Sequence, residues 1–384
     1  MLTRRRFQEH LASVAAALAV GGERALAQRW LLERRAPPHM IWLNANENPD
    51  GPPARALEAM ARALPECWRY HYPEFPDIYA AVARSEQLAG DQVLVGAGSS
   101  EVLCAAVHAF TSESRPLITP DPSFELPADL AAALGRRVVR VPLAEGYSAD
   151  VGRLQEAAAR AGGGLVYLCN PNNPTSSLTS ADKLAWLVEN LPPAAVLLVD
   201  EAYLHFVEDY ERLSAVQCVR QGREVIVTRT FSKIYGMAGV RVGFGCARAD
   251  LIRRMRPFRS GVISYAGAQG VLAALEEGTR LVAERRARLV RVRRAFCDWL
   301  REKGLTYIEP HANFVMIDVG RDVRPLIEAL WQRGIAVGRP FPPLDHMLRV
   351  SIGRDGDMAR FCEVFESLYS AERLSAAPGA RKSA

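Results

Sequence analysis

Lysine is rare in this sequence, and one lysine lies where its amine could act as a nucleophile. The chain has 384 residues and only four lysines, at positions 183, 233, 303 and 382. Lys233 stands between hydroxyl residues and a glycine-rich stretch in Thr228–Gly243, and Arg241 follows eight residues after it. A lysine amine can form a Schiff base with a carbonyl compound, and an arginine can bind an anion. An exposed lysine without a chemical role is the usual alternative.

Other polar residues adjoin apolar runs. Asp200 directly follows Ala195–Val199, and its carboxylate could pair with a protonated ring nitrogen or cap a helix. Two X-Pro turns shape the loop Cys169–Ser176, in which Asn173 can donate its amide to an oxygen. Arg349 begins a later apolar run and could bind a carboxylate through two hydrogen bonds.

The segment Gly96–Glu101 lies between a predicted strand and a predicted helix over 102–110. Small and hydroxyl residues at a helix N-terminus offer backbone N–H groups to a phosphate, although this pattern is also an ordinary helix cap. Together, these segments supply an amine, a partner for a pyridinium nitrogen, donors for a ring oxygen, a phosphate cup and a carboxylate clamp. Pyridoxal 5′-phosphate requires this set.

The elements that would position these residues alternate between strands and helices. Seven candidate strands precede a helical stretch over Glu276–Lys303: Gln92–Val95, Arg115–Ile118, Arg137–Val141, Gly164–Cys169, Ala195–Val199, Glu224–Thr228 and Arg241–Cys246. Shorter candidates follow at Ala312–Val319, Ile335–Val337 and Leu348–Ile352. Near-continuous apolar strands are typical of a parallel sheet covered on both faces. The sequence therefore predicts a mainly parallel α/β large domain over 65–265, a smaller α/β domain over 266–384, and an arm over 28–64 that contributes to the smaller domain.

The combined motifs resemble the fold-type I aminotransferases, and within them the histidinol-phosphate aminotransferase branch. The matching segments are Leu43–Pro49, Tyr72–Glu74, Gly96–Glu101, Asn170–Thr175, Asp200–Tyr203, Thr230–Lys233 with Arg241, and Leu348–Gly353. The resemblance implies a pyridoxal-phosphate-dependent enzyme that moves an amino group between an L-amino acid, or a related amine such as histidinol phosphate, and a 2-oxo acid.

The resemblance also implies a role for individual residues. Lys233 would hold the cofactor as a Schiff base and move a proton during the reaction, while Asp200 would keep the pyridine nitrogen protonated. Tyr203 and Asn173 would bind the ring 3-oxygen, and Phe124 would stack on the ring. The expected phosphate ligands are Ser99, Ser100, Thr230, Ser232 and Arg241.

Tyr72 would reach the phosphate of a neighbouring subunit, which implies a homodimer. Arg349 would bind the substrate carboxylate, and Asn46 is a further expected substrate contact. Arg339 lies in the Pro-rich segment 337–344, where it would either bind a second anionic group or sit on the surface. Ser176 departs from the family pattern, which more often has glycine there.

Two other classes of function stay open at this point. The same residues would hold the cofactor in a decarboxylase, lyase or oxidase, because they do not fix which bond at Cα breaks. A non-catalytic, exported binding protein on an inactivated enzyme fold would be expected to lack Lys233, Asp200 or Arg349, and all three are present.

Composition excludes several classes of protein. The net charge of +5 gives no nucleic-acid signal, and the arginine-rich stretch 285–294 has the apolar stripe of a helix with one solvated face. Seven scattered cysteines lack zinc-ligand spacing, so free buried thiols and no metal site are expected. No apolar run reaches the ~20 residues needed to span a bilayer.

The first 27 residues read as an export signal. Arg4, Arg5 and Phe7 are followed by the apolar run Leu11–Val20 and by Ala25-Leu-Ala27. A basic region, a short apolar region and a small-residue cleavage site form a secretory signal, and the paired arginines resemble the twin-arginine type. This predicts a periplasmic or exported protein. The alternative is an amphipathic N-terminal helix on a cytoplasmic protein.

Overall fold

The computed structural model describes residues 36–37, 39–259 and 261–376. At the centre of its large domain is a seven-stranded sheet. Its order is β2-β8-β7-β6-β5-β3-β4. All neighbouring pairs are parallel except those of β8, which runs antiparallel to β2 and β7. The strands are β2 (Val93–Gly96), β3 (Leu117–Asp121), β4 (Val138–Pro142), β5 (Gly164–Cys169), β6 (Ala195–Asp200), β7 (Val225–Thr230) and β8 (Gly243–Ala247). The predicted mainly parallel α/β fold is confirmed.

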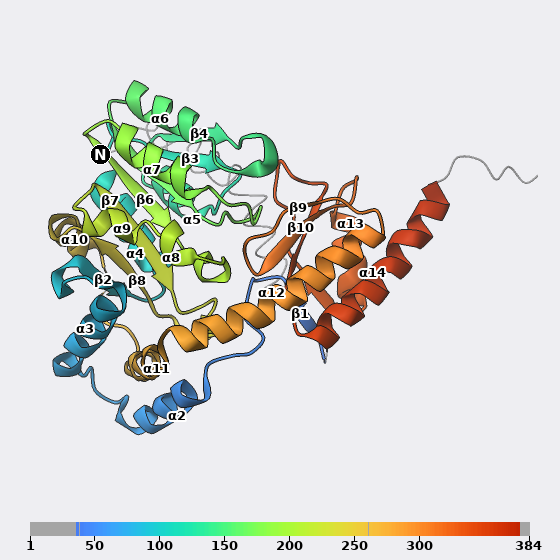
Figure 1. Ribbon diagram of the computed structural model, residues 1–384, viewed down its shortest axis with the longest axis horizontal. Helices are drawn as coiled ribbons and strands as arrows, with labels where there is room; N and C mark the ends of the chain where they lie inside the picture. Colours follow the sequence, from blue (N-terminus) through green and yellow to red (C-terminus); the bar gives the residue numbers. More distant parts are fainter. Residues whose placement is uncertain (1–35, 38, 260, 377–384) are drawn as a thin grey trace, which may run out of the picture.

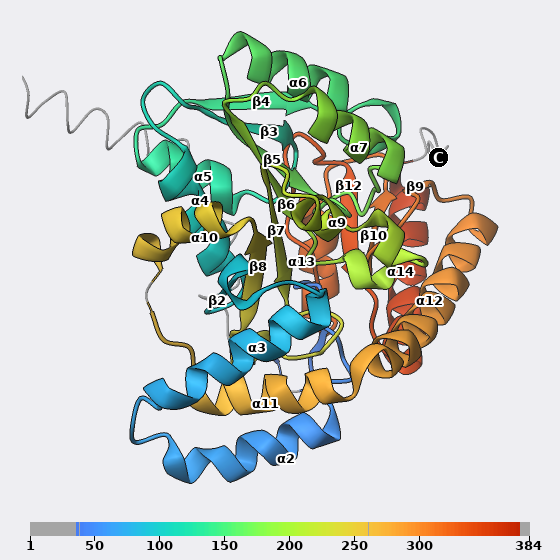
Figure 2. The same cartoon turned by 60° about the vertical axis from the view of Figure 1, so that its left-hand side comes forward.

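Helices cover both faces of this sheet (Figure 2). Every residue of β5, β6 and β7 is buried, which explains their continuous apolar sequences. One face carries α4 (Ser99–Phe110), α5 (Leu126–Ala133) and α10 (Ala249–Met255). The other carries α6 (Val151–Arg160), α7 (Ala181–Asn190) and α9 (Val216–Arg220), with the short α8 (Tyr210–Leu213) nearby.

The chain before the large sheet packs in two places. Strand β1 (Ile41–Leu43) pairs in parallel with β11 (Ile335–Val337) of the smaller domain. Helix α2 (Ala54–Ala63) and helix α3 (Phe75–Glu86) lie against α11 (Tyr265–Glu276) at one end of the molecule (Figure 1). Gly270 permits the close approach of α11 to α2, because a Cβ there would lie 2.6 Å from Cγ of Met60.

The long helix α12 (Gly278–Glu302) runs from α11 into the smaller domain (Figure 1). That domain contains an antiparallel sheet in the order β12-β10-β9. Its elements are β9 (Tyr307–Ile308), β10 (Phe314–Asp318), α13 (Arg324–Gln332), β12 (Met347–Ser351) and α14 (Asp355–Ala376). The helix predicted over Glu276–Lys303 is confirmed as α12, which begins at Gly278, whose φ is +62°, directly after α11 ends at Glu276.

The predicted export signal over 1–27 lies outside the described residues. Within the described part of the chain, no helix is both long and apolar enough to cross a membrane.

Candidate active site

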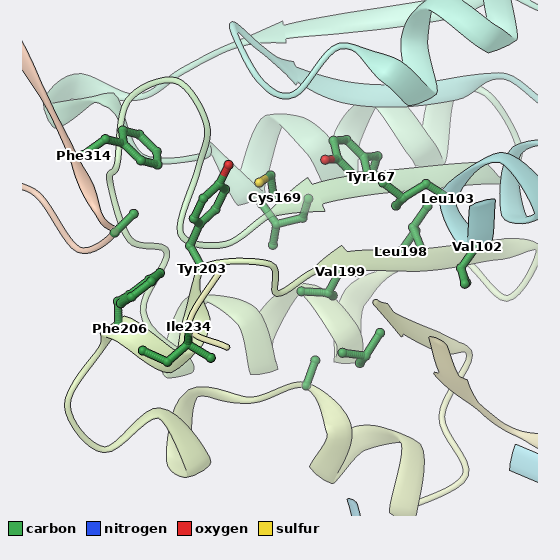
Figure 3. Close-up of a cluster of buried hydrophobic side chains, with 14 of the residues drawn as sticks. Val102, Leu103, Tyr167, Cys169, Leu198, Val199, Tyr203, Phe206, Ile234 and Phe314 are labelled. Atoms are coloured by element: carbon green, nitrogen blue, oxygen red, sulfur yellow. The ribbon is translucent and has the colours of Figure 1, made fainter. Parts of the chain in front are cut away.

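Predicted site residues from both domains meet at the carboxyl edge of the large sheet, beside β10 and β12. Ligands bind at this edge in open α/β sheets. Figure 3 shows Tyr203 between Cys169 at the end of β5 and Phe314 of β10. The Tyr203 and Phe314 rings are 5.1 Å apart and nearly perpendicular. The residues that the structure gathers here are Asn46, Asn173, Asp200, Tyr203, Lys233 and Arg349.

Asp200 ends β6 as a buried carboxylate that only neutral groups contact. Its Oδ1 accepts hydrogen bonds from Thr228 Oγ1 at 3.1 Å and from the Ala202 N–H at 3.2 Å. Its Oδ2 accepts one from the Tyr167 hydroxyl at 3.2 Å. Burial raises its pKa to about 6, although these hydrogen bonds act in the opposite direction. Since no described cation pairs with it, Asp200 is suited to receive one.

Two side-chain amides donate hydrogen bonds to the Tyr203 hydroxyl. It accepts from Nδ2 of Asn46 at 3.1 Å and from Nδ2 of Asn173 at 3.5 Å. Burial raises its pKa, so the hydroxyl keeps its proton at neutral pH. Asn46 is fixed in turn by Ser351, whose Oγ donates to its Oδ1 at 3.0 Å and accepts from its backbone N–H at 2.9 Å.

Arg349 is a buried cation without a carboxylate partner among the described residues. Its Nη1 donates to Oδ1 of Asn173 at 2.6 Å, and its Nη2 donates to the carbonyl of Asn44 at 2.7 Å. Its Nε is buried with no hydrogen-bond partner. Burial lowers its pKa to about 10. A buried charge of this kind is costly unless an anion joins it.

Lys233 lies in the loop after β7, close to Tyr203. Its Nζ donates to the carbonyl of Ala45 at 3.1 Å and is 5.5 Å from the centroid of the Tyr203 ring. Burial, and then the positive charge of Arg349, lower its pKa to about 8. A substantial fraction of this amine is therefore neutral, and so nucleophilic, slightly above neutral pH.

The predicted phosphate cup forms where β8 passes the N-terminus of α4. A Cβ on Gly98 would collide with the Arg241 guanidinium, so the absence of a side chain allows the arginine to approach. Arg241 Nη1 donates to Ser232 Oγ at 3.2 Å, and Thr230 Oγ1 donates to the same oxygen at 2.9 Å. These groups converge beside Ser99, the first residue of α4.

Glu101 lies in the first turn of α4, and its Oε2 accepts from the Ala97 N–H at 2.6 Å. The N-cap residue is Gly98, and no described side chain caps this helix, so its first backbone N–H groups stay available. A helix N-terminus with its backbone donors facing a cationic arginine is a site for a phosphate.

Three other predicted residues lie outside this group of contacts. Phe124 is half-buried and packs against the core. Arg339 is paired with Glu125, and its Cζ is 4.3 Å from the centroid of the Phe341 ring. Tyr72 is 63% exposed and stacks on Tyr70, so within this chain it does not join the residues around Lys233.

Ser176, the departure from the family pattern, adopts the left-handed conformation that favours glycine, with φ of +61°. Hydrogen bonds to the Ser176 hydroxyl offset the cost of this backbone conformation. The hydroxyl accepts the backbone N–H of His311 at 3.1 Å and that of Ala312 at 2.9 Å, so it ties the loop after β5 to the smaller domain.

The comparisons with known proteins agree with this arrangement. The model of the aminotransferase class I and II family matches residues 38–365. The chain belongs to this family. It is 36% identical to a histidinol-phosphate aminotransferase of Symbiobacterium thermophilum, over 85% of this chain and 90% of that one. It is 31% identical to an aromatic amino acid aminotransferase of Cutibacterium acnes, over 84% of this chain and 91% of that one.

Two solved structures are also similar to this aminotransferase. A putative histidinol-phosphate aminotransferase of Erwinia carotovora atroseptica has a TM-score of 0.84 and 29% identity, and covers 88% of this chain and 99% of its own. The histidinol-phosphate aminotransferase of Sinorhizobium meliloti, in complex with pyridoxal 5′-phosphate, has a TM-score of 0.79 and 28% identity, with 86% and 91% covered.

The enzyme is a pyridoxal-phosphate-dependent aminotransferase, and its residues fit that cofactor. When bound, pyridoxal 5′-phosphate supplies an electron sink for negative charge that develops at the substrate Cα. Asp200, a buried acid without a cation, would face a protonated ring nitrogen, and the cup at Ser99 and Arg241 would hold the phosphate. Tyr203 would donate to the ring oxygen, and Lys233 would carry a proton at the substrate Cα.

Several residues of the site escaped the sequence analysis. Tyr167 and Thr228 lie inside apolar strands, where nothing marks them as partners of Asp200. Asn313 is fully buried and donates from Nδ2 to the carbonyl of Asn46 at 2.9 Å and to that of Glu47 at 3.3 Å. A polar residue immediately before the apolar run Phe314–Ile317 is a signal that could have identified Asn313.

Proposed function

We propose that the amino donor of this aminotransferase is an L-amino acid, held by its α-carboxylate at Arg349, and that a 2-oxo acid accepts the amino group in the same place. The single observation that carries this is the buried Arg349 guanidinium. It has a free Nε donor and no carboxylate partner among the described residues. A carboxylate can take two parallel hydrogen bonds from a guanidinium, and here it would also neutralise a buried charge.

A second candidate donor is histidinol phosphate, which has a phosphate and no α-carboxylate. Two observations favour it. Several relatives of the chain are named histidinol-phosphate aminotransferases, and a second cation, Arg339, contacts the same Phe341 ring as Arg349. In that case Arg349 would serve the 2-oxo acid alone, and Arg339 would bind the phosphate.

A half-reaction screen separates the two donors. The cofactor-loaded enzyme is mixed with one candidate amine at a time, and the loss of the absorbance of the cofactor bound to the enzyme is followed. We expect rapid loss with L-amino acids and a stoichiometric yield of 2-oxo acid without carbon dioxide or peroxide. Rapid loss with histidinol phosphate alone would contradict the first candidate and support the second. Released carbon dioxide would contradict transamination.

We also infer that the functional unit is a homodimer in which Tyr72 completes the site of the partner. Its support is a group of exposed apolar side chains near the start of the chain, because contiguous exposed apolar surface usually marks a contact with another protein. Tyr72 belongs to this group, and the other members are Leu57, Leu64, Trp68 and Tyr70.

Subunit mixing tests the shared site. Tyr72→Phe and Lys233→Ala each impair a different half of a shared site, so each mixed dimer should regain one native site. Mixing wild-type protein with Lys233→Ala should leave the activity per wild-type subunit unchanged, which controls for effects of mixing itself. A fully active monomer in light scattering would contradict the proposal.

For the location of the enzyme we propose export by the twin-arginine route, with cleavage after Ala27. The order of basic, apolar and small residues over 1–27 supports this, as do seven cysteines that form no disulfide among the described residues. Replacing Arg4 and Arg5 by lysine should trap uncleaved protein in the cytoplasm. Wild-type protein that keeps Met1 and fractionates with cytoplasmic markers would contradict export.

A further inference from the structure

Beside Arg349, a second guanidinium carries its own counter-charge. Arg339 forms an ion pair through Nη2 with the Glu125 carboxylate, and its Nη1 donates to the carbonyl of Pro340 at 2.9 Å. The side chains of Arg339 and Glu125 are 18% and 22% exposed, so the pair is largely withdrawn from water. Such a pair interacts more strongly than one on the surface.

The ion pair is adjacent to the proposed carboxylate clamp. The ring of Phe341 contacts both guanidiniums, with its centroid 4.3 Å from Cζ of Arg339 and 4.4 Å from Cζ of Arg349. Glu125 follows Phe124, the residue expected to stack on the cofactor ring. A substrate held at Arg349 would therefore lie next to a second cation that an acid of the protein already neutralises.

We propose that Glu125 is a specificity-determining residue that competes with the substrate side chain for Arg339. This inference rests on the proposed binding of a substrate carboxylate at Arg349. An anionic side chain, carboxylate or phosphate, must displace Glu125 from Arg339 and then lies beside the negative charge of Glu125. A neutral side chain leaves the ion pair intact and packs against it and Phe341. The enzyme thus disfavours substrates whose side chain adds a second negative charge to that of the α-carboxylate, and the negative charge of Glu125 is the cause.

The mechanism of discrimination is electrostatic. Like charges brought together in a partly desolvated site repel each other, and displacing Glu125 also loses its ion pair with Arg339. Removing the negative charge while keeping the size of the side chain should therefore release Arg339 for an anionic substrate. The variant Glu125→Gln does this, and Glu125→Asp keeps the charge while shortening the side chain.

The test compares two nearly isosteric donors, L-glutamate and L-glutamine, which differ in the charge of the side chain. The ratio of the kcat/KM for L-glutamate to that for L-glutamine should rise about tenfold or more in Glu125→Gln, because the repulsion between two negative charges is relieved. In Glu125→Asp it should not rise, and in Arg339→Gln it should fall below the wild-type value. The control Glu363→Gln removes an exposed acid paired with Arg360 at 2.7 Å on α14, and the ratio should stay at the wild-type value.

An equilibrium measurement gives a readout that is independent of turnover. Titration calorimetry with glutarate and with pentanoate, which differ by one carboxylate, should show tighter glutarate binding in Glu125→Gln and unchanged discrimination in Glu363→Gln. An unchanged ratio in both assays would overturn the role of Glu125, and an equal rise in Glu125→Gln and Glu125→Asp would assign the effect to packing. Absence of a half-reaction with either donor, while glutarate discrimination still shifts, would contradict the proposed donor and leave the Glu125 inference supported.

Discussion

Two adjacent acids of this aminotransferase, Asp200 and Glu201, should respond in opposite ways when their charge is removed. Burial raises the pKa of Asp200 from its ordinary 3.8 to about 6. Since one pH unit corresponds to about 1.36 kcal/mol, the ionised carboxylate costs the cofactor-free protein about 3 kcal/mol at neutral pH. Between pH 4 and 6 the folded state binds this proton more tightly than the unfolded chain. Stability from this group is therefore lost as the pH rises through that window.

Asp200→Asn removes this cost. The amide must rearrange the hydrogen bonds from Tyr167 and Thr228, which costs about 1 kcal/mol. The cofactor-free variant should therefore be more stable than wild type at pH 8 by about 2 kcal/mol, which raises Tm by a few degrees. At pH 4 most of this advantage should disappear. Its turnover should fall by a factor of ~10²–10³, because a preorganised charge opposite the cofactor is lost.

Glu201→Gln is the matched control. Glu201 is as buried as Asp200 but pairs with Arg229 at 2.9 Å, and it also accepts from Ser214 Oγ at 3.0 Å and the Ala215 N–H at 2.6 Å. Loss of these charge-assisted hydrogen bonds should destabilise the protein by about 1–3 kcal/mol. Thermal unfolding of the cofactor-free variants at pH 8 and pH 4 measures both effects. If Asp200→Asn is less stable than wild type at pH 8 and turns over normally, Asp200 is only a structural acceptor and the reasoning fails.

Three further predictions concern the same site. Borohydride should fix the cofactor to the peptide that contains Lys233 and leave no adduct in Lys233→Ala; an adduct on another lysine in mass spectrometry would contradict the assignment. The rate of cofactor capture should rise with pH around a midpoint near 8, the pKa of Lys233, and Arg349→Gln should move that midpoint upward by removing a nearby cation; a midpoint that stays fixed would refute this coupling. Ser176→Ala and Ser176→Gly both lose two hydrogen bonds to the hydroxyl, but only glycine also relieves the strain of the left-handed backbone, so Ser176→Ala should lower Tm more; the reverse order would show that strain at this position is negligible.

Much of the large domain could be predicted because its signals are local. A run of five apolar residues ending in Asp200 both predicts a buried strand and locates an acid at its carboxyl end. Ser176 also stood out in the sequence, because the family pattern more often has glycine at this position. The structure then shows the left-handed backbone that glycine favours.

Contacts between distant segments could not be predicted. The direction of β8 depends on how the chain returns to the sheet, and its sequence is equally suited to a parallel strand. The ion pair of Glu125 with Arg339 joins residues that are 214 positions apart. No periodicity or propensity records such a pairing, because it arises only when the two domains pack together.

The most direct test of the central claim is the stoichiometry of a single half-reaction. Enzyme loaded with pyridoxal 5′-phosphate is mixed with excess amino donor in the absence of any 2-oxo acid, and the products are counted against the sites. We expect one equivalent of 2-oxo acid per site, an equal amount of aminated cofactor, no carbon dioxide, and no product from Lys233→Ala. Continuous turnover without an acceptor, or an equal product yield from Lys233→Ala, would contradict amino-group transfer at this site.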